Sequence, residues 1–466
     1  MGNSTISRTL GDFVAGLRFA DLPPEVVENA KVRVLDTVGV CLASVGAPYA
    51  EAVFDLCAEQ GAATTAAAFG KARRMPEVWA ALYNGSLAHG NDYDDTHSES
   101  IVHIGGVAVP TAVALAEKVG GSGRDLLTAV VAGYEVAARI GAAASKGLHA
   151  QGFHPTGVCG AFSAAAVAGK LMGLSGAQLA NAFGVAGSQA SGSLEFLSDG
   201  AWTKRIHPGW AAHAGIIAAG LARRGFRGPA FEFEGRYSLY ALYATNTKPD
   251  LARATRGLGT EWEILDTDVK PYPCGHISHP YMDCALRLRD EHGLTPEQID
   301  SIELHVPAAA VPILLEPIAD KRRPASSYAA RFSMPYAVAV ILTRGRAGID
   351  EFSDEAIRDP AASMLCDRTT YLIDDTLPFP HTFPGSLRLR LKDGRELEAR
   401  MDASRGSREI PMTPAELRQK FTDNARRALP AQRVDALWDA GQALERAGDI
   451  REFSNLTTVS SMTEQS

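Results

Sequence analysis

The chain has 466 residues, of which 46% are hydrophobic and 21% charged, and its formal net charge at pH 7 is −8. This composition excludes a disordered chain, and the length is sufficient for two domains that each have a hydrophobic core. The acidic balance argues against nucleic acid as a partner, because proteins that bind nucleic acid present basic surfaces.

The first part of the chain, up to about residue 265, has a helical pattern throughout. Prolines or capping residues precede the expected helices and glycines tend to follow them, as helix ends require. We expect helices over 25–42, 77–90, 111–119, 125–144 and 156–172. They are rich in alanine and glycine, which lets neighbouring helix axes approach closely in a large helical domain.

The pattern changes near residue 265, where alternating apolar and polar residues indicate strands. Asp393-Gly394 joins two of these segments as a hairpin turn. The expected strands are 299–306, 371–373, 386–392 and 395–401, with helices over 280–291 and 334–342 between them. Residues 266–409 therefore form a smaller α+β domain in this prediction.

The C-terminal part of the chain returns to amphipathic helical patterns, over 414–428 and 432–447. We expect these helices to pack on the first domain. The predicted fold is thus mainly α, with an all-helical domain built from residues 1–265 and 410–466 and with residues 266–409 as an α+β lid.

Six cysteines occur, and none of them forms a C-x-x-C pair, so a zinc ribbon is poorly supported. The N-terminus lacks the pattern of a secretory signal, and reduced thiols are typical of the cytoplasm. The apolar stretch 158–173 is rich in alanine and glycine and is interrupted by Lys170, which indicates a buried helix and not a membrane span. We expect a cytoplasmic protein without membrane contacts.

The first of four unusual polar segments is 90–97, which places Asp92, Asp94 and Asp95 within four residues and is followed by His103. Carboxylates this close repel one another, so other groups must stabilise them. The segment could be a solvated loop with a helix cap. Metal binding is the other alternative, but the spacing fits neither an EF-hand loop nor an H-E-x-x-H pattern.

The second segment places His154 directly before Pro155 and Thr156, where a helix is expected to begin. The N-terminus of a helix presents unpaired N–H groups and a partial positive charge, which suits an anion. His154 would then lie beside an anion site, although it could also be only a neighbour of the helix cap.

The third segment, 199–210, combines the adjacent cations Lys204 and Arg205 with Trp202 and Trp210. Apolar helices on both sides predict a loop buried near the core, where a lysine needs an anionic partner. The fourth segment, 270–280, has the sequence KPYPCGHISHP and lies at the predicted domain junction, where ligand clefts are common.

Together these segments supply histidines, lysines and an aspartate that suit proton transfer at a carbon next to a carboxylate. Such a carbon is very weakly acidic, so the reaction needs a positioned base and cations that neutralise the carboxylate as charge develops. The candidate residues are His103, His154, His276, Lys204, Lys270 and Asp92. The chain contains no Walker motif, no G-x-S-x-G elbow and no dinucleotide-binding fingerprint, and buried structural thiols are the expected state of Cys159 and Cys274.

At these positions the sequence closely resembles the MmgE/PrpD family, whose members include 2-methylcitrate dehydratase, cis-aconitate decarboxylase and iminodisuccinate epimerase. The matching stretches are HGNDYDDTH, GFHPTGVCGAFSAAAVAGK, GSQASGSLEFLSDGAWTKRIHPGWAAHAG, KPYPCGHISHP and SSYAARFSMPYAVA, in the family's order. The resemblance implies a homodimer without a cofactor or a metal, and an active site between the two domains.

The resemblance also implies roles for individual residues. The catalytic set carried over by motif is His103, His154, Asp92, Lys204 and Lys270, and the substrate-binding set is Thr96, Arg205, His276 and Tyr328. In this interpretation the two histidines exchange protons with the substrate. The two lysines are expected to bind substrate carboxylates, because neither has an obvious acidic partner in its own segment. The alternative is that each lysine pairs with a protein carboxylate, such as Asp92, Asp94 or Asp95, and supports the fold.

The family resemblance implies proton transfer at a carbon next to a carboxylate, but it does not determine which group leaves the substrate. Our first expectation is a dehydratase of a small hydroxy-polycarboxylic acid such as 2-methylcitrate. An epimerase or a decarboxylase of a related acid, resembling iminodisuccinate or cis-aconitate, is the second. A non-catalytic helical binding protein is the third, and the retention of the histidines and lysines argues against it.

Overall fold

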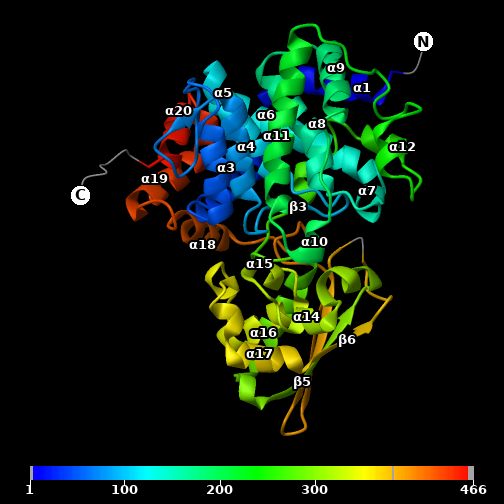
Figure 1. The fold of residues 1–466 in the computed structure, drawn as a ribbon, viewed down its shortest axis with the longest axis vertical. Helices are drawn as coiled ribbons and strands as arrows, with labels where there is room; N and C mark the ends of the chain where they lie inside the picture. Colours follow the sequence, from blue (N-terminus) through cyan, green and yellow to red (C-terminus); the bar gives the residue numbers. More distant parts are fainter. Residues whose placement is uncertain (1–3, 380–381, 460–466) are drawn as a thin grey trace.

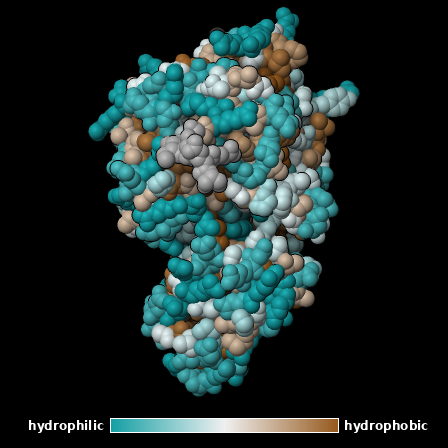
Figure 2. All heavy atoms as spheres, turned by 60° about the vertical axis from the view of Figure 1, so that its left-hand side comes forward, coloured by the Kyte–Doolittle hydropathy of each residue, from teal (hydrophilic) through white to brown (hydrophobic). Residues whose placement is uncertain are grey.

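A computed structural model describes residues 4–379 and 382–459 of the chain. Two bodies are distinct in Figure 1, a large helical one and a smaller one that contains the main sheet. Figure 2 shows a mostly hydrophilic surface with a narrowing between them. Each body has its own hydrophobic core, and the core of the large one combines residues up to Ile264 with residues from Phe421 onward.

The helical domain is built from long helices joined by short turns. They are α1 (Ile6–Gly16), α2 (Pro24–Ala43), α3 (Pro48–Ala58), α4 (Glu77–Ala88), α5 (Gly105–Val119), α6 (Gly123–Ala143), α8 (Pro155–Leu171), α9 (Gly176–Gly187) and α11 (Thr203–Arg223). Three short helices, α7 (Gly147–Ala150), α10 (Phe196–Asp199) and α12 (Leu239–Tyr243), lie in the connections.

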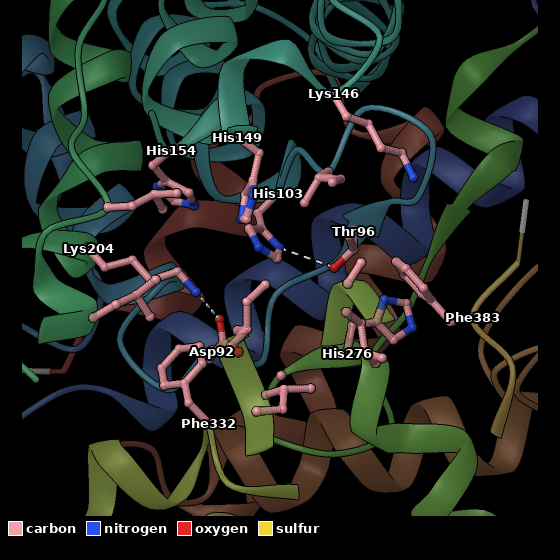
Figure 3. Close-up of a pocket in the computed structure, with 18 of the residues that line it drawn as sticks. Asp92, Thr96, His103, Lys146, His149, His154, Lys204, His276, Phe332 and Phe383 are labelled. Carbon is pink, nitrogen blue, oxygen red and sulfur yellow. Dashed lines mark hydrogen bonds and ion pairs between the residues drawn. The ribbon is translucent and has the colours of Figure 1, made fainter. Parts of the chain in front are cut away.

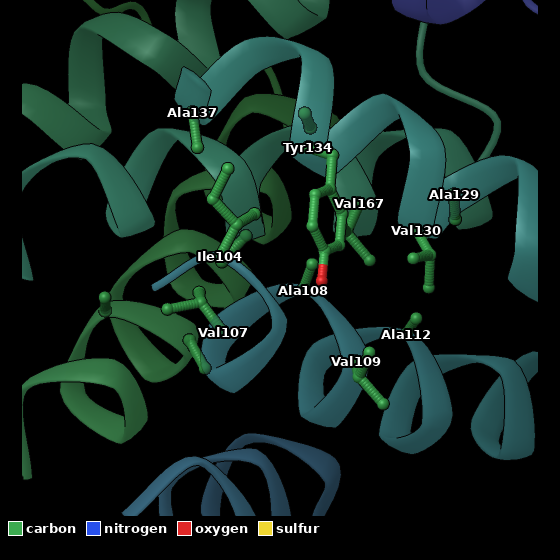
Figure 4. Packing of buried hydrophobic residues seen from close by; sticks show 14 of the residues in the cluster. Ile104, Val107, Ala108, Val109, Ala112, Ala129, Val130, Tyr134, Ala137 and Val167 are labelled. Atoms are coloured by element: carbon green, nitrogen blue, oxygen red, sulfur yellow. The ribbon is translucent and has the colours of Figure 1, made fainter. Parts of the chain in front are cut away.

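Small residues allow the central helices to pack closely. Figure 4 shows α5, α6 and α8 in contact through alanines and valines, with Tyr134 between them. On α11, a methyl group added at Gly215 would lie 2.4 Å from Cβ of Ala164 on α8, so only glycine permits this approach. This close packing keeps the helix ends that carry the site in fixed positions.

In the part of the chain that the structure describes, α6 alone is long and apolar enough to cross a membrane as a single helix. Every residue of its apolar stretch is buried inside the protein, where it packs on α8. This is the environment of a core helix.

The smaller domain contains a four-stranded mixed sheet in the order β6-β5-β7-β8. Its strands are β5 (Ile299–Val306), β6 (Thr369–Ile373), β7 (Gly385–Leu391) and β8 (Glu396–Met401), and β6 is the parallel neighbour of β5. The helices are α13 (His279–His292), α14 (Ile318–Arg322), α15 (Ser327–Ala330), α16 (Met334–Arg344) and α17 (Pro360–Asp367). The mainly α fold with a smaller α+β domain confirms the predicted fold class.

The last helices, α18 (Pro414–Ala425), α19 (Ala431–Gln442) and α20 (Arg451–Ser454), belong to the helical body. Phe421 of α18 lies in its core, and Lys420 pairs with Asp36 of α2 at 2.6 Å. The predicted C-terminal range extends to residue 466, and its final part, 460–466, lies outside the described residues.

Two helix starts differ from the sequence-based expectation. α5 begins at Gly105 and not after Pro110, and α11 begins at Thr203, so the segment expected as a buried loop is in large part helical. Both helices contain an internal proline, Pro110 or Pro208, which removes one backbone hydrogen bond. Burial of these helices against α4 and α8 outweighs that loss, because tertiary packing overrides local propensity.

Candidate active site

A cavity of about 300 Å³ lies between the two domains. Its wall includes seven of the nine residues proposed from the sequence, namely Asp92, Thr96, His103, His154, Lys204, Lys270 and His276. Figure 3 shows the histidines and lysines coming from separate elements toward one space. Residues from distant segments thus meet in one site at the domain boundary.

The helical domain positions most of these side chains at the ends of its elements. His154 is the residue before α8, and its backbone N–H donates to the carbonyl oxygen of Gly192 at 2.9 Å. Lys204 lies in the first turn of α11. Thr96 is in β3 (Thr96–His97), which pairs with β4 (Thr267–Asp268), and Lys270 follows two residues after β4. The small β3–β4 pairing therefore holds the two sides of the site together.

Asp92 is the carboxylate at the centre of the cationic part of the cavity. Its Oδ1 accepts a hydrogen bond from Nζ of Lys204 at 2.6 Å and lies 3.5 Å from Nζ of Lys270, which also donates to the Asp92 carbonyl oxygen at 3.0 Å. Burial by itself would raise the pKa of Asp92, but the two ammonium groups outweigh it and hold that pKa well below its usual range.

This geometry matches the alternative in which the two lysines pair with a protein carboxylate from another segment. Both converge on Asp92, and all three side chains are almost completely buried. The sequence offered three neighbouring aspartates and no means of choosing among them. Asp94 is a second buried carboxylate close to both lysines, so the charges of this group are nearly balanced, and its ammonium groups remain available as contacts for an anionic ligand.

The hydrogen bonds of His103 define which ring nitrogen can act as a base. Its Nδ1 lies 2.7 Å from the carbonyl oxygen of Asp95. A carbonyl oxygen can only accept, so Nδ1 carries the proton and donates it, which leaves Nε2 unprotonated. Burial, assisted by Lys270, keeps the pKa of His103 well below its usual value, so the ring is neutral at pH 7. His103 is therefore present in the form of a general base.

His154 faces the same cavity from the start of α8. Its Nδ1 lies 3.0 Å from Nδ1 of His207, so one of these two rings donates and the other accepts. The Nε2 atom of His154 is buried and has no hydrogen-bond partner in the described residues. Burial lowers the pKa of His154 well below its usual value. A ring nitrogen left free beside a cavity is suited to exchange a proton with a ligand.

His276 lies on the α+β side of the cavity and has Asp268 as its acidic neighbour. Its Nε2 is 3.5 Å from Oδ2 of Asp268. Burial lowers the pKa of His276 to about 3 and raises that of Asp268 to about 7. Near pH 7 Asp268 is therefore only partly ionised, and His276 contributes a neutral ring to the cavity.

Two residues expected to bind substrate, Arg205 and Tyr328, are not brought to the cavity wall. The guanidinium of Arg205 lies 4.0 Å from the ring centroid of Tyr328 and donates to the carbonyl oxygen of Gly90 at 3.1 Å. Because α11 is helical here, Lys204 and Arg205 point in different directions, and only Lys204 lines the cavity. Arg205 instead holds the turn that precedes Asp92.

His89, which the sequence analysis did not single out, packs against His103 and His154, two of the histidines that line the cavity. Its Nδ1 is 2.8 Å from the carboxylate of Asp94, and its ring centroid is 4.9 Å from that of His103 and 5.2 Å from that of His154. The ring nitrogens of these three histidines lie within 4.8 Å of one another, an arrangement that can hold a metal ion. The spacing of the residues along the sequence did not reveal this cluster.

The charges around the three histidines argue against a bound cation. Lys204 or Lys270 lies close enough to each ring to help lower its pKa, and the same ammonium groups would repel a divalent ion. We therefore expect full activity after exhaustive treatment with a chelator, measured beside an untreated sample. Reproducible loss of activity that one specific metal restores would contradict this expectation.

Comparison with known proteins agrees with the sequence resemblance. Residues 8–252 match the MmgE/PrpD N-terminal domain, and residues 272–446 match the MmgE/PrpD C-terminal domain. A cis-aconitate decarboxylase-like protein of Aspergillus oryzae is 27% identical over 96% of this chain and 96% of its own. Cis-aconitate decarboxylase of Homo sapiens is 28% identical over 98% and 94%.

The mitochondrial 2-methylcitrate dehydratase of Yarrowia lipolytica is 26% identical over only 40% of this chain and 37% of its own. The names of these relatives describe enzymes that act on small polycarboxylic acids. The two matching domains cover most of the sequence and every residue that lines the cavity except Lys270, which lies in the connection 253–271 between them. The chain therefore belongs to the MmgE/PrpD family.

Proposed function

We propose that the protein is a lyase that acts on a small polycarboxylic acid by proton transfer at a carbon next to a carboxylate. The observation that carries this proposal is the placement of His103 and His154 beside the Lys204–Asp92 pair in one cavity. The neutral rings can take up a proton and return it, and the ammonium groups of Lys204 and Lys270 can contact the carboxylate next to the reacting carbon.

Decarboxylation is the preferred reaction within this proposal, and dehydration of a 2-methylcitrate-like acid is the second. The support is that relatives named cis-aconitate decarboxylase match along almost the whole chain, whereas the dehydratase relative matches less than half of it. Both reactions move a proton at carbon, but in opposite directions. Dehydration removes the proton and hydroxide leaves as water, whereas decarboxylation releases carbon dioxide and the resulting carbanion takes up a proton. Epimerisation of a related acid would use the transfer alone.

A panel of polycarboxylates that includes cis-aconitate and 2-methylcitrate separates these reactions. Trapped carbon dioxide reports decarboxylation, a new conjugated C=C bond seen in the ultraviolet reports dehydration, and loss of optical rotation without either reports epimerisation. We expect carbon dioxide from cis-aconitate or a close analogue. A folded protein that yields none of the three signals would instead favour a non-catalytic binding protein.

We also propose that the protein is a homodimer. Several large apolar side chains are exposed on and beside α11, with Trp202 at 52%, Trp210 at 45% and Ile217 at 38% exposure. Contiguous exposed apolar residues mark interaction surfaces, and Trp210 and Ile217 lie two helical turns apart on one face. Light scattering at micromolar concentration should give the mass of two chains, and a monomer would contradict this proposal.

A further inference from the structure

The cavity has a second cationic group that none of the sequence motifs includes. Lys146 precedes α7 and lines the cavity on the side away from Lys204, as Figure 3 shows. Its ammonium nitrogen is buried and has no hydrogen-bond partner among the described residues. Burying an ammonium group without a partner costs free energy, and an anion bound in the cavity would remove that cost.

Apolar side chains separate Lys146 from the proton-transfer groups. Nζ of Lys146 lies 5.0 Å from the ring centroid of Phe379, which is 6.0 Å from that of Phe383, which in turn is 4.6 Å from that of His276. The nearby lining is also largely apolar and includes Ile101, Ile277, Ile313 and Leu314, with His149 as a polar group close to Lys146. The apolar side chains offer no hydrogen bonds, so the part of the cavity that they line suits hydrocarbon and disfavours a carboxylate.

The charges of the cavity are therefore divided between two places. At one end the ammonium groups of Lys204 and Lys270 lie beside the carboxylates of Asp92 and Asp94. At the other end Lys146 supplies an ammonium group that has no hydrogen-bond partner among the described residues, although the carboxylate of Glu99 is near enough to raise its pKa. The histidines between them are neutral because burial lowers the pKa of His103, His149, His154 and His276. A ligand that contacts the ammonium groups at both ends carries two separated groups of negative charge.

We propose that Lys146 binds a distal carboxylate, so that the substrates are polycarboxylic acids in which an apolar segment separates one carboxylate from the acid groups at the reacting end. This inference rests on the proposed function and extends its substrate class from the acids of the panel to analogues of them that carry such an apolar segment. Burial lowers the pKa of Lys146 to about 8, so the amine stays largely protonated at neutral pH, and a bound carboxylate would raise that pKa again.

Two unreactive succinates that differ only at the end of a side chain test this role. One carries a butyl chain that ends in a carboxylate, and the other carries a pentyl chain of the same length. By calorimetry, the wild-type protein should bind the carboxylate-ended probe at least ~10-fold more tightly, as a charge-assisted hydrogen bond predicts. Lys146→Met should abolish this preference or reverse it, and Lys146→Arg should retain most of it.

Lys248→Met is the matched control, because Lys248 is exposed and does not line the cavity, and it should bind both probes as the wild type does. Lys146→Asn serves as a second variant, since asparagine tolerates the left-handed backbone (φ 63) at this position. An unchanged preference in folded Lys146 variants, or a wild type that prefers the pentyl probe, would overturn this inference alone. Binding of neither probe would overturn it together with the proposed function.

Discussion

Lys204→Met should destabilise the protein markedly and abolish turnover. The change leaves Asp92 as a buried carboxylate whose closest partner is gone, and breaking a buried ion pair costs about 3–5 kcal/mol. Lys270, at 3.5 Å, still compensates part of the charge, so we expect a loss near the lower end of that range. Denaturant unfolding measures the stability, and turnover per folded molecule measures the catalytic effect.

The double variant Asp92→Asn/Lys204→Met separates the structural role of Lys204 from its catalytic role. The double variant has no buried carboxylate at position 92 that lacks a cationic partner. It should therefore regain most of the lost stability while remaining inactive. Lys31→Met provides a control, because Lys31 is a buried lysine that pairs with Glu28 at 2.8 Å away from the cavity, and it should keep wild-type turnover. A Lys204→Met protein with normal turnover per folded molecule would remove Lys204 from the mechanism.

His103→Asn should lower turnover by ~10²–10⁴, the usual contribution of a general acid or base, with little loss of stability. Asparagine keeps a polar group beside the Asp95 carbonyl but has no nitrogen that takes up a proton near neutral pH. His154→Asn should have an effect of similar size. Steady-state kinetics with the acid identified from the panel measure both effects, and near-normal turnover in both variants would contradict the proton-transfer assignment.

His213→Asn is the matched control for these variants, since His213 stacks on Trp210 outside the cavity and its loss should leave turnover unchanged. The pH profile adds a second readout. Because burial holds the pKa of His103 well below its ordinary value of about 6.5, the base form persists as the pH falls. Activity should therefore decline only below pH ~6.5, as the pH approaches the lowered pKa in the folded protein.

The elements that local patterns determine could be predicted from the sequence. The strands β5, β7 and β8 follow from alternation and from the Asp393-Gly394 turn, and the structure places them within one or two residues of the expected ranges. The starts of α5 and α11 could not be predicted in this way. In α5 the internal Pro110 resembles a helix start, and in α11 Pro208 and Gly209 resemble the end of a loop. Packing against distant helices determines the conformation in both cases.

The site shows the same division between local and distant information. Most of its residues stood out as clusters of histidine, lysine and aspartate, and seven of the nine line the cavity. Their partners depend on contacts between distant segments, such as Lys204 with Asp92, 112 residues apart. Lys146 lies in a segment of ordinary composition, and His89 begins the stretch HGNDYDDTH without any local sign of its partners, so only the fold shows that they border the cavity or its histidines.

Exchange of hydrogen for deuterium tests the central claim most directly, because it follows the proton and does not depend on which group leaves. Proton NMR would follow the panel of polycarboxylates in deuterium oxide with the wild-type protein and with His103→Asn. We expect deuterium to appear at a carbon next to a carboxylate in at least one acid, and the variant to lose this incorporation. A folded wild-type protein that incorporates no deuterium into any acid, or a His103→Asn variant that incorporates it at the wild-type rate, would contradict the account.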